Sequence, residues 1–156
     1  MFIVRRFAWV AAIGCVAALP VRAAQAASQR SAHRLCAPVR ATGVGQDLGG
    51  GMTTATISSH GIVLGHTHAN FAMGPITGTS ASFTGPIMFT SGVGSLTANV
   101  AGAFDVSTGA FRATSQSITG TGLLRRVTGR VTINGLEDLN TGSFTETITG
   151  RLCAGR

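Results

Sequence analysis

Residues 95–114 read Ser-Leu-Thr-Ala-Asn-Val-Ala-Gly-Ala-Phe-Asp-Val-Ser-Thr-Gly-Ala-Phe-Arg-Ala-Thr, and their side chains alternate in character. Successive side chains of a β-strand point to opposite faces, so an alternation with a period of two indicates a strand with one buried face. The segment predicts a strand over 95–104, a turn, and a second strand over 110–119. Every second residue of the first strand forms its core face, namely Leu96, Ala98, Val100, Gly102 and Phe104.

The same strand–turn–strand pattern recurs further along the chain, where residues 135–147 match residues 102–114. Both copies hold an Asp, a Thr-Gly pair and a Phe in the same order. The Asp can accept hydrogen bonds from its own turn, and the Gly can adopt positive φ. Asp105 and Asp138 are therefore assigned a structural role in their turns.

The rest of the chain after Cys36 has the same organisation, with short alternating segments separated by Gly-containing turns. This pattern is typical of an antiparallel barrel or sandwich. Gly74-Pro75 and Gly85-Pro86 are expected to mark a turn and a bulge or edge position, because proline cannot donate to a sheet ladder. The expected strands cover residues 38–45, 52–59, 61–72, 81–90, 95–104, 110–119, 129–136 and 143–152.

The first 26 residues have the composition of a secretory signal peptide. Arg5 and Arg6 provide the positive start, residues 7–19 form an apolar run, and residues 24–26 (Ala-Gln-Ala) fit a small-x-small cleavage site. The run is shorter than the roughly 20 apolar residues that span a bilayer. An uncleaved anchor and a lipoprotein attached at Cys15 are the alternatives.

Cleavage after residue 26 leaves a disordered lead-in over 27–35 and one β-barrel domain over 36–156, expected to be secreted or periplasmic. Two of the three cysteines remain in this mature part, Cys36 near its start and Cys153 near its end. Two cysteines in an exported domain most simply form a disulfide, and two unpaired thiols are the alternative.

The mature part contains no lysine, tyrosine or tryptophan, and nine arginines stand against five acidic residues. A binder of single-stranded nucleic acid needs a basic groove with stacking aromatics, so this composition argues against a nucleic-acid partner. No second apolar run is long enough to cross a membrane. Nucleotide-binding fingerprints and a Gly-x-Ser-x-Gly motif are also absent, and no cofactor is expected.

One Gly-rich segment carries a resemblance to a known family. Residues 120–129 (Gly-Thr-Gly-Leu-Leu-Arg-Arg-Val-Thr-Gly) resemble the Gly-x-Gly-x-Phe-x-Gly-Ala-x-Gly segment of allene oxide cyclase-like and dirigent-like barrels, including small exported bacterial members. Leu124 and Arg126 depart from that pattern. The resemblance implies a single antiparallel eight-stranded, calycin-like barrel with an apolar lumen, and a homotrimer. It does not carry over the cyclase activity, because fold alone does not fix function.

Glu146 is the main candidate for chemistry. It alternates with threonines and shares one strand face with Phe144 and Ile148, so it is expected inside the barrel. There it would act as an acid/base or ligand anchor, with Phe111, Phe144 and Ile148 lining the lumen. A position at the wet mouth, or a pairing with an arginine, is the alternative.

Two weaker candidates involve basic side chains. His66 and His68 lie on one strand face at metal-ligand spacing, but two ligands do not make a zinc site, and exposed strand histidines are the alternative. Arg125, Arg126 and Arg130 could bind an anion, or belong to a solvated loop.

The sequence thus favours an exported, non-catalytic barrel that binds a small apolar or amphipathic molecule or acts at the cell surface. A lumenal isomerase or cyclase that uses Glu146 is the second hypothesis. A metal-binding protein that uses His66 and His68 is the third.

Overall fold

A computed structural model describes residues 35–60 and 62–155 of this chain. The expected signal peptide over 1–26 lies outside the described residues, as do residues 27–34 of the expected lead-in. Leu35, the last residue of that lead-in, is already part of the first strand. Strand formation therefore begins one residue before the expected domain boundary.

The described chain is built from nine β-strands and one short 3-10 helix. Their bounds are β1 Leu35–Gly49, β2 Met52–Ser59, β3 Ile62–Asn70, β4 Ala72–Thr77, β5 Ser80–Ser91, β6 Gly94–Asp105, β7 Ala110–Gly120, η1 Gly122–Leu124, β8 Val127–Glu137 and β9 Ser143–Ala154.

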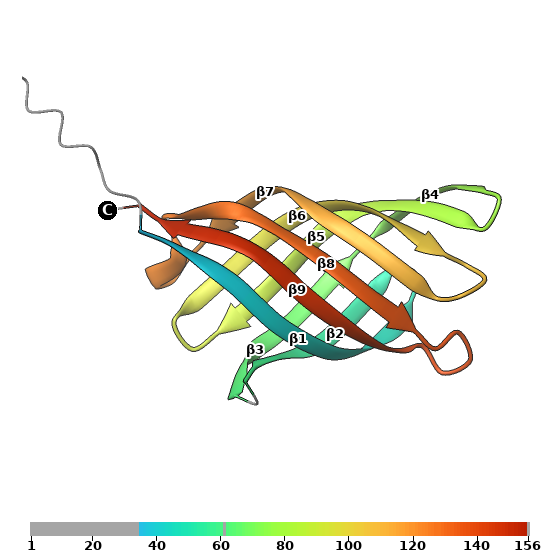
Figure 1. Cartoon of the computed structure of the whole chain (residues 1–156), viewed down its shortest axis with the longest axis horizontal. Helices are drawn as coiled ribbons and strands as arrows, with labels where there is room; N and C mark the ends of the chain where they lie inside the picture. The colour runs from blue at the N-terminus through green and yellow to red at the C-terminus, as the bar shows by residue number, and fades with distance from the viewer. Residues whose placement is uncertain (1–34, 61, 156) are drawn as a thin grey trace, which may run out of the picture. The chain divides into compact units, whose positions relative to one another are not determined.

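The strands close into an antiparallel barrel, which is one of the two folds that the alternation predicted and the one that the resemblance implied (Figure 1). The sheet order is β3-β2-β1-β9-β8-β7-β6-β5, and a further pairing between β3 and β5 closes the ring. Chain neighbours are sheet neighbours, and β1 pairs with β9 over twelve residues, so the barrel is an up-and-down meander. Closure of an eight-stranded ring leaves an interior wide enough for side chains and one small ligand.

The single strand expected over 61–72 is in fact two strands, β3 and β4. β4 continues past Gly74-Pro75. β3 and β4 pair with β5 in one register, since Ala69 faces Ile87 and Ala72 faces Thr84. The ladder breaks between them, opposite Gly85 and Pro86, because proline has no amide hydrogen to donate. Gly74-Pro75 lies in a bulge of β4, whereas the turn expected there comes at Gly78, whose φ is 64°.

The two repeated hairpins form as expected. Asp105 Oδ1 accepts hydrogen bonds from Ser107 N at 2.9 Å and from Thr108 N at 3.1 Å, while Asp138 Oδ1 accepts one from Asn140 N at 2.9 Å. The matching glycines have φ of 76° at Gly109 and 69° at Gly142. Both aspartates thus stabilise turns, which is the role assigned from the sequence.

The inner wall pairs large side chains with glycines on the neighbouring strand. Across the ladders, Phe83 faces Gly102, Phe111 faces Gly135, Phe144 faces Gly45 and Glu146 faces Gly43. A Cβ atom at Gly43 would lie 2.5 Å from Glu146 Oε1 and 2.6 Å from Glu146 Cγ. These glycines therefore leave the space that the large inward side chains occupy.

Cys36 and Cys153 form the predicted disulfide. They lie directly opposite each other on β1 and β9, at a separation of 117 residues. By loop-closure entropy such a link contributes at most about 4–5 kcal/mol to the free energy of unfolding. It fastens the first strand of the barrel, β1, to its last strand, β9.

We predict that Gly135→Ala lowers the free energy of unfolding by about 1–3 kcal/mol, because the new methyl group would collide with the Phe111 ring and the Thr145 carbonyl. Urea denaturation of the oxidised protein measures the change. Gly92→Ala is the matched control, since a Cβ there meets open space. Equal stability of the two variants would show that the inner-wall glycines are not sterically required.

Candidate functional site: an acidic cavity lined by phenylalanines

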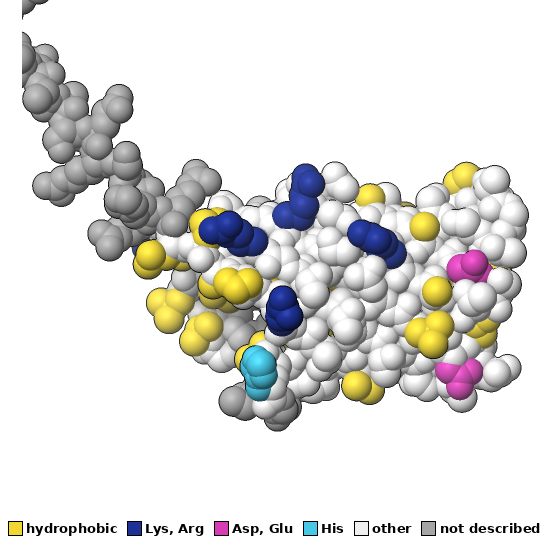
Figure 2. Space-filling model, in the orientation of Figure 1, with side chains coloured by type: hydrophobic (Ala, Val, Ile, Leu, Met, Phe, Trp, Pro, Cys, Tyr) yellow, Lys and Arg dark blue, Asp and Glu magenta, His cyan; other side chains and the backbone are white. Residues whose placement is uncertain are grey.

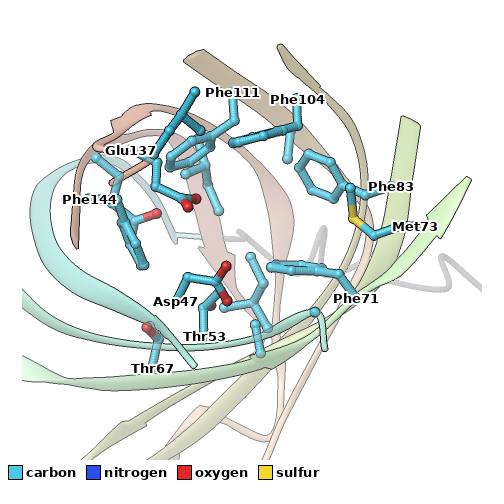
Figure 3. A pocket seen from close by; sticks show the side chains of 17 residues that line it. Asp47, Thr53, Thr67, Phe71, Met73, Phe83, Phe104, Phe111, Glu137 and Phe144 are labelled. Atoms are coloured by element: carbon cyan, nitrogen blue, oxygen red, sulfur yellow. The ribbon is translucent and has the colours of Figure 1, made fainter. Parts of the chain in front are cut away.

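A cavity of about 270 Å³ opens at one end of the barrel, between the β1–β2, β6–β7 and β8–β9 turns. We call this the acidic cavity. Figure 3 shows its ring of aromatic side chains and the carboxylates among them. Its lining residues are Asp47, Gly51, Thr53, Thr67, Ala69, Phe71, Met73, Phe83, Ile87, Phe104, Phe111, Ala113, Ile133, Glu137, Leu139, Phe144 and Glu146.

Five phenylalanines form most of the apolar wall. Phe71 and Phe83 pack with ring centroids 5.0 Å apart and tilted planes, and Phe111 packs edge-on against Phe144 at 5.8 Å. These are the offset arrangements that aromatic pairs prefer. Phe104 completes the set, so rings from β5, β6, β7 and β9 and from the β3–β4 link surround the cavity.

Three carboxylate side chains face the same space, from Asp47 at the end of β1, Glu137 at the end of β8 and Glu146 within β9. In Figure 3 the Asp47 and Glu137 carboxylates point into the cavity, across from Phe83 and Phe71. No arginine or histidine lines the cavity in the described part of the chain. The cavity therefore has a largely apolar wall and a group of carboxylates that no basic side chain among the described residues neutralises.

Glu146 points into the barrel, as its alternation with threonines predicts. Burial raises the pKa of its carboxyl from 4.5 to about 7. Within residues 35–60 and 62–155, no hydrogen-bond donor or cation contacts this carboxyl group, so the pairing with an arginine is not found among them. Close to neutral pH the group therefore exchanges between its neutral and charged forms.

The other two carboxylates differ in their surroundings. Burial and the charge of Asp47 both raise the pKa of Glu137. Asp47 Oδ1 accepts a hydrogen bond from Gly49 N at 2.9 Å, and Asp47 N donates to Gly142 O at 2.8 Å. These bonds hold Asp47 at the rim between the β1–β2 and β8–β9 turns.

The remaining two acids, Asp105 and Asp138, lie at the same end but serve the hairpin turns. Hydrogen bonds from Ser107 lower the pKa of Asp105 to about 2, and those from Asn140 and Thr141 lower the pKa of Asp138. All five acids are thus near one end of the barrel. In Figure 2 the acidic side chains of the visible face lie near that end, and the arginines are spread over the rest of the wall.

A second cavity of about 360 Å³ occupies the other end of the lumen. Ile133 and Ile148 face each other across β8 and β9, yet Ile133 lines the acidic cavity and Ile148 the second one. The boundary between the two cavities therefore lies near this level. Ile148, grouped with Phe144 and Glu146 from the sequence, belongs to the other cavity, which has no acidic or arginine lining residue among those described.

The basic candidates lie away from the acidic cavity. His66 and His68 are exposed on β3, where His66 also lines the second cavity, and Thr67 between them points inward. His66 Nδ1 lies 3.3 Å from Thr56 Oγ1. The described residues include no group of three or more metal-ligating side chains. Arg125, Arg126 and Arg130 are exposed, the first two in the link that follows η1 and the third on β8.

The sequence analysis did not place Asp47, Glu137 or three of the phenylalanine and methionine side chains of the wall inside the barrel. The alternation of inward and outward side chains could have placed both acids on an inner face. Asp47 follows Gly43 and Gly45 on the inner face of β1, and Glu137 follows Ile133 on the inner face of β8. The expected strands ended at residues 45 and 136, short of both acids. These wall side chains are Phe71, Met73 and Phe83, whereas Phe104 was expected on a core face.

Comparison with protein-family models, with curated proteins and with solved structures gives no match. The allene oxide cyclase-like assignment therefore stays a prediction. None of the helical residues in the described part of the chain belongs to a helix long and apolar enough to cross a membrane.

We predict that Glu146→Gln stabilises the protein at pH 8 and changes little at pH 4. The raised pKa means that the folded state binds a proton that the unfolded state releases between about pH 4.5 and 7, so native stability falls as pH rises through this window. Across this window the free energy of unfolding falls by an amount on the order of 3 kcal/mol, and Gln, which does not ionise, removes this loss.

Denaturant unfolding from pH 4 to 8 measures this effect. Asp105→Asn is the contrasting control, since the lowered pKa of Asp105 gives stability that is present above pH 4 and is lost as pH falls toward 2. If Glu146→Gln is no more stable than the native protein at pH 8, the carboxyl is not buried in the way described.

Proposed function

We propose that this protein binds a small amphipathic molecule in the acidic cavity and does not transform it. The observation that carries the proposal is the cavity itself, which joins five phenylalanine rings to a carboxyl group that no described residue neutralises. Binding sites for small molecules are typically concave, mostly apolar and supplied with a few polar groups that fix orientation. The acidic cavity has each of these properties.

The cavity that remains open beside Glu146 supports a binding role over a purely structural one. Gly43 and Gly135 flank Glu146 on both neighbouring strands, and neither strand places a larger side chain beside it. Unfilled space in a protein interior costs stability, so a core under selection for stability alone would be filled. Glu146 and the Phe111 ring occupy the space beside these two glycines, and the volume that stays open is the cavity at the centre, about 270 Å³.

We further propose that the barrel works outside the reducing cytosol. The Cys36–Cys153 disulfide is of the kind that persists in secreted and periplasmic proteins. The signal peptide expected over residues 1–26 agrees with this location. A role at the cell surface stays a prediction, as does the homotrimer that the resemblance to allene oxide cyclase-like barrels implies.

We predict that the neutral apolar dye N-phenyl-1-naphthylamine binds with a stoichiometry of one per acidic cavity, seen as a rise in dye fluorescence. Thr53→Trp should abolish this binding, because Thr53 lines the acidic cavity and a large ring would fill it. Val93→Trp is the matched control, since Val93 is exposed and lines only the second cavity.

Loss of dye binding in Val93→Trp but not in Thr53→Trp would move the site to the second cavity and contradict the proposal. Absence of dye binding to the native protein would contradict it altogether.

The pKa of Glu146, near 7, favours one further candidate, an acid/base enzyme such as an isomerase or cyclase. A general base works best when its pKa lies near the working pH, and Glu137 and Asp47 line the same cavity as possible second groups.

For this candidate we predict that the native protein speeds exchange of the acidic C–H protons of 2-tetralone in deuterated water, followed by proton NMR. Glu146→Gln should lose the acceleration and still bind the neutral dye. Equal exchange rates with native protein, Glu146→Gln and buffer alone would exclude a base role for Glu146 on such a carbon acid.

A further inference from the structure

We infer that the ligand of the acidic cavity is a hydrophobic cation, whose apolar body lies among the phenylalanine rings and whose ammonium group lies against Glu146, Glu137 and Asp47. This inference rests on the proposed function, because it specifies the ligand class of the same cavity.

The first support is charge balance. Carboxylates from β1, β8 and β9 face one small space, and no arginine or histidine among the described residues lines it. A carboxylate in an apolar cavity is costly to ionise unless a positive charge approaches it. The protein supplies none at this position, so a cationic ligand would provide the missing charge.

The second support is the spacing of the three carboxylates. Within the described residues, no three acidic, histidine or cysteine side chains come close enough to share one metal ion. The three carboxylates instead come from three different strands around the cavity, and in Figure 3 those of Asp47 and Glu137 both point into it. Such an arrangement suits a bulky organic cation, whose charge is spread over several carbon atoms, better than a point charge.

The third support is the aromatic wall. The faces of aromatic rings carry partial negative charge and attract ammonium groups, most strongly when water is excluded. Phe71, Phe83, Phe104, Phe111 and Phe144 all line the acidic cavity, whereas Phe89, the sixth phenylalanine of the described chain, lines the second cavity. Rings and carboxylates are thus concentrated at the same end of the barrel, and both favour a cation.

This assignment makes binding dependent on pH. Asp47, Glu137 and Glu146 are the titratable groups that face the ligand, from β1, β8 and β9 respectively. A permanently charged ligand binds best when these groups are ionised, so its affinity should rise as pH increases through 7. A neutral ligand of the same length should show no such rise.

The test compares three probes with the same eight-carbon chain: octyltrimethylammonium, octanol and octanoate. Each displaces N-phenyl-1-naphthylamine from the native protein, and dissociation constants follow from the displacement curves. We expect the cation to bind about tenfold or more tightly than octanol at pH 8, and octanoate to bind most weakly. Between pH 5.5 and 8 the affinity for the cation should increase by about tenfold.

Glu146→Gln should reduce the affinity for octyltrimethylammonium by about tenfold and leave that for octanol unchanged. Asp138→Asn is the matched control. It removes the same formal charge at the same end of the barrel, but Asp138 belongs to the turn and does not line the cavity. The affinity of this control for the cation should stay within about twofold of the native value, which corresponds to about 0.4 kcal/mol.

The outcomes separate the two proposals. If octanol or octanoate binds as tightly as the cation, the cavity binds amphiphiles without regard to charge, and only the present inference fails. Equal losses of affinity in Glu146→Gln and Asp138→Asn would also overturn it, because general charge and not the cavity carboxylate would be responsible. If none of the three probes displaces the dye from a folded protein, the proposed function fails as well.

Discussion

The pairing of large inward side chains with glycines on neighbouring strands is the constraint on which the rest of the barrel depends. An eight-stranded ring is narrow, and its interior cannot hold a large side chain at every inward position. Glu146 lies between Gly43 and Gly135, and Phe144 lies opposite Gly45. Because these glycines carry no Cβ, the rings and the carboxyl group can lie along the wall and leave the centre open. The cavity, its aromatic lining and the burial of Glu146 all follow from this arrangement.

The position of each acid then decides its chemistry. Asp105 and Asp138 lie in turns, where hydrogen bonds from nearby residues stabilise the charged form and lower the pKa. Glu146 lies on the inner wall, where burial raises the pKa to about 7. Acidic residues thus stabilise the hairpin turns at the surface, whereas inside the barrel Glu146 changes its charge near neutral pH. Such a group costs stability above neutral pH, and a bound cation would offset that cost.

Much of this fold could be predicted from the sequence, because alternation and turn residues are local signals. Val131, Ile133 and Phe144 are buried as their strand parity predicts, and the disulfide joins the cysteines expected to pair. The break between β3 and β4 was missed, since it depends on Pro86 in a different strand. Glu146 was placed correctly, but the predicted strands stopped before Asp47 and Glu137. The grouping of the three carboxylates depends on barrel closure, which brings β1 beside β9. The predicted disulfide indicates that contact, but no local pattern gives the register that places Asp47 and Glu137 beside the cavity.

A cation that meets the Glu146 carboxyl group inside the acidic cavity should displace its proton. Titration calorimetry of octyltrimethylammonium at pH 6.5, in buffers with different ionisation enthalpies, counts the protons that binding releases. At this pH most Glu146 carboxyl groups are protonated, and a cation beside them would favour the ionised form. We expect that a large fraction of a proton is released per ligand bound by the native protein, and that this release disappears in Glu146→Gln. Binding without proton release, or with proton uptake, would show that the cation does not meet this carboxyl group.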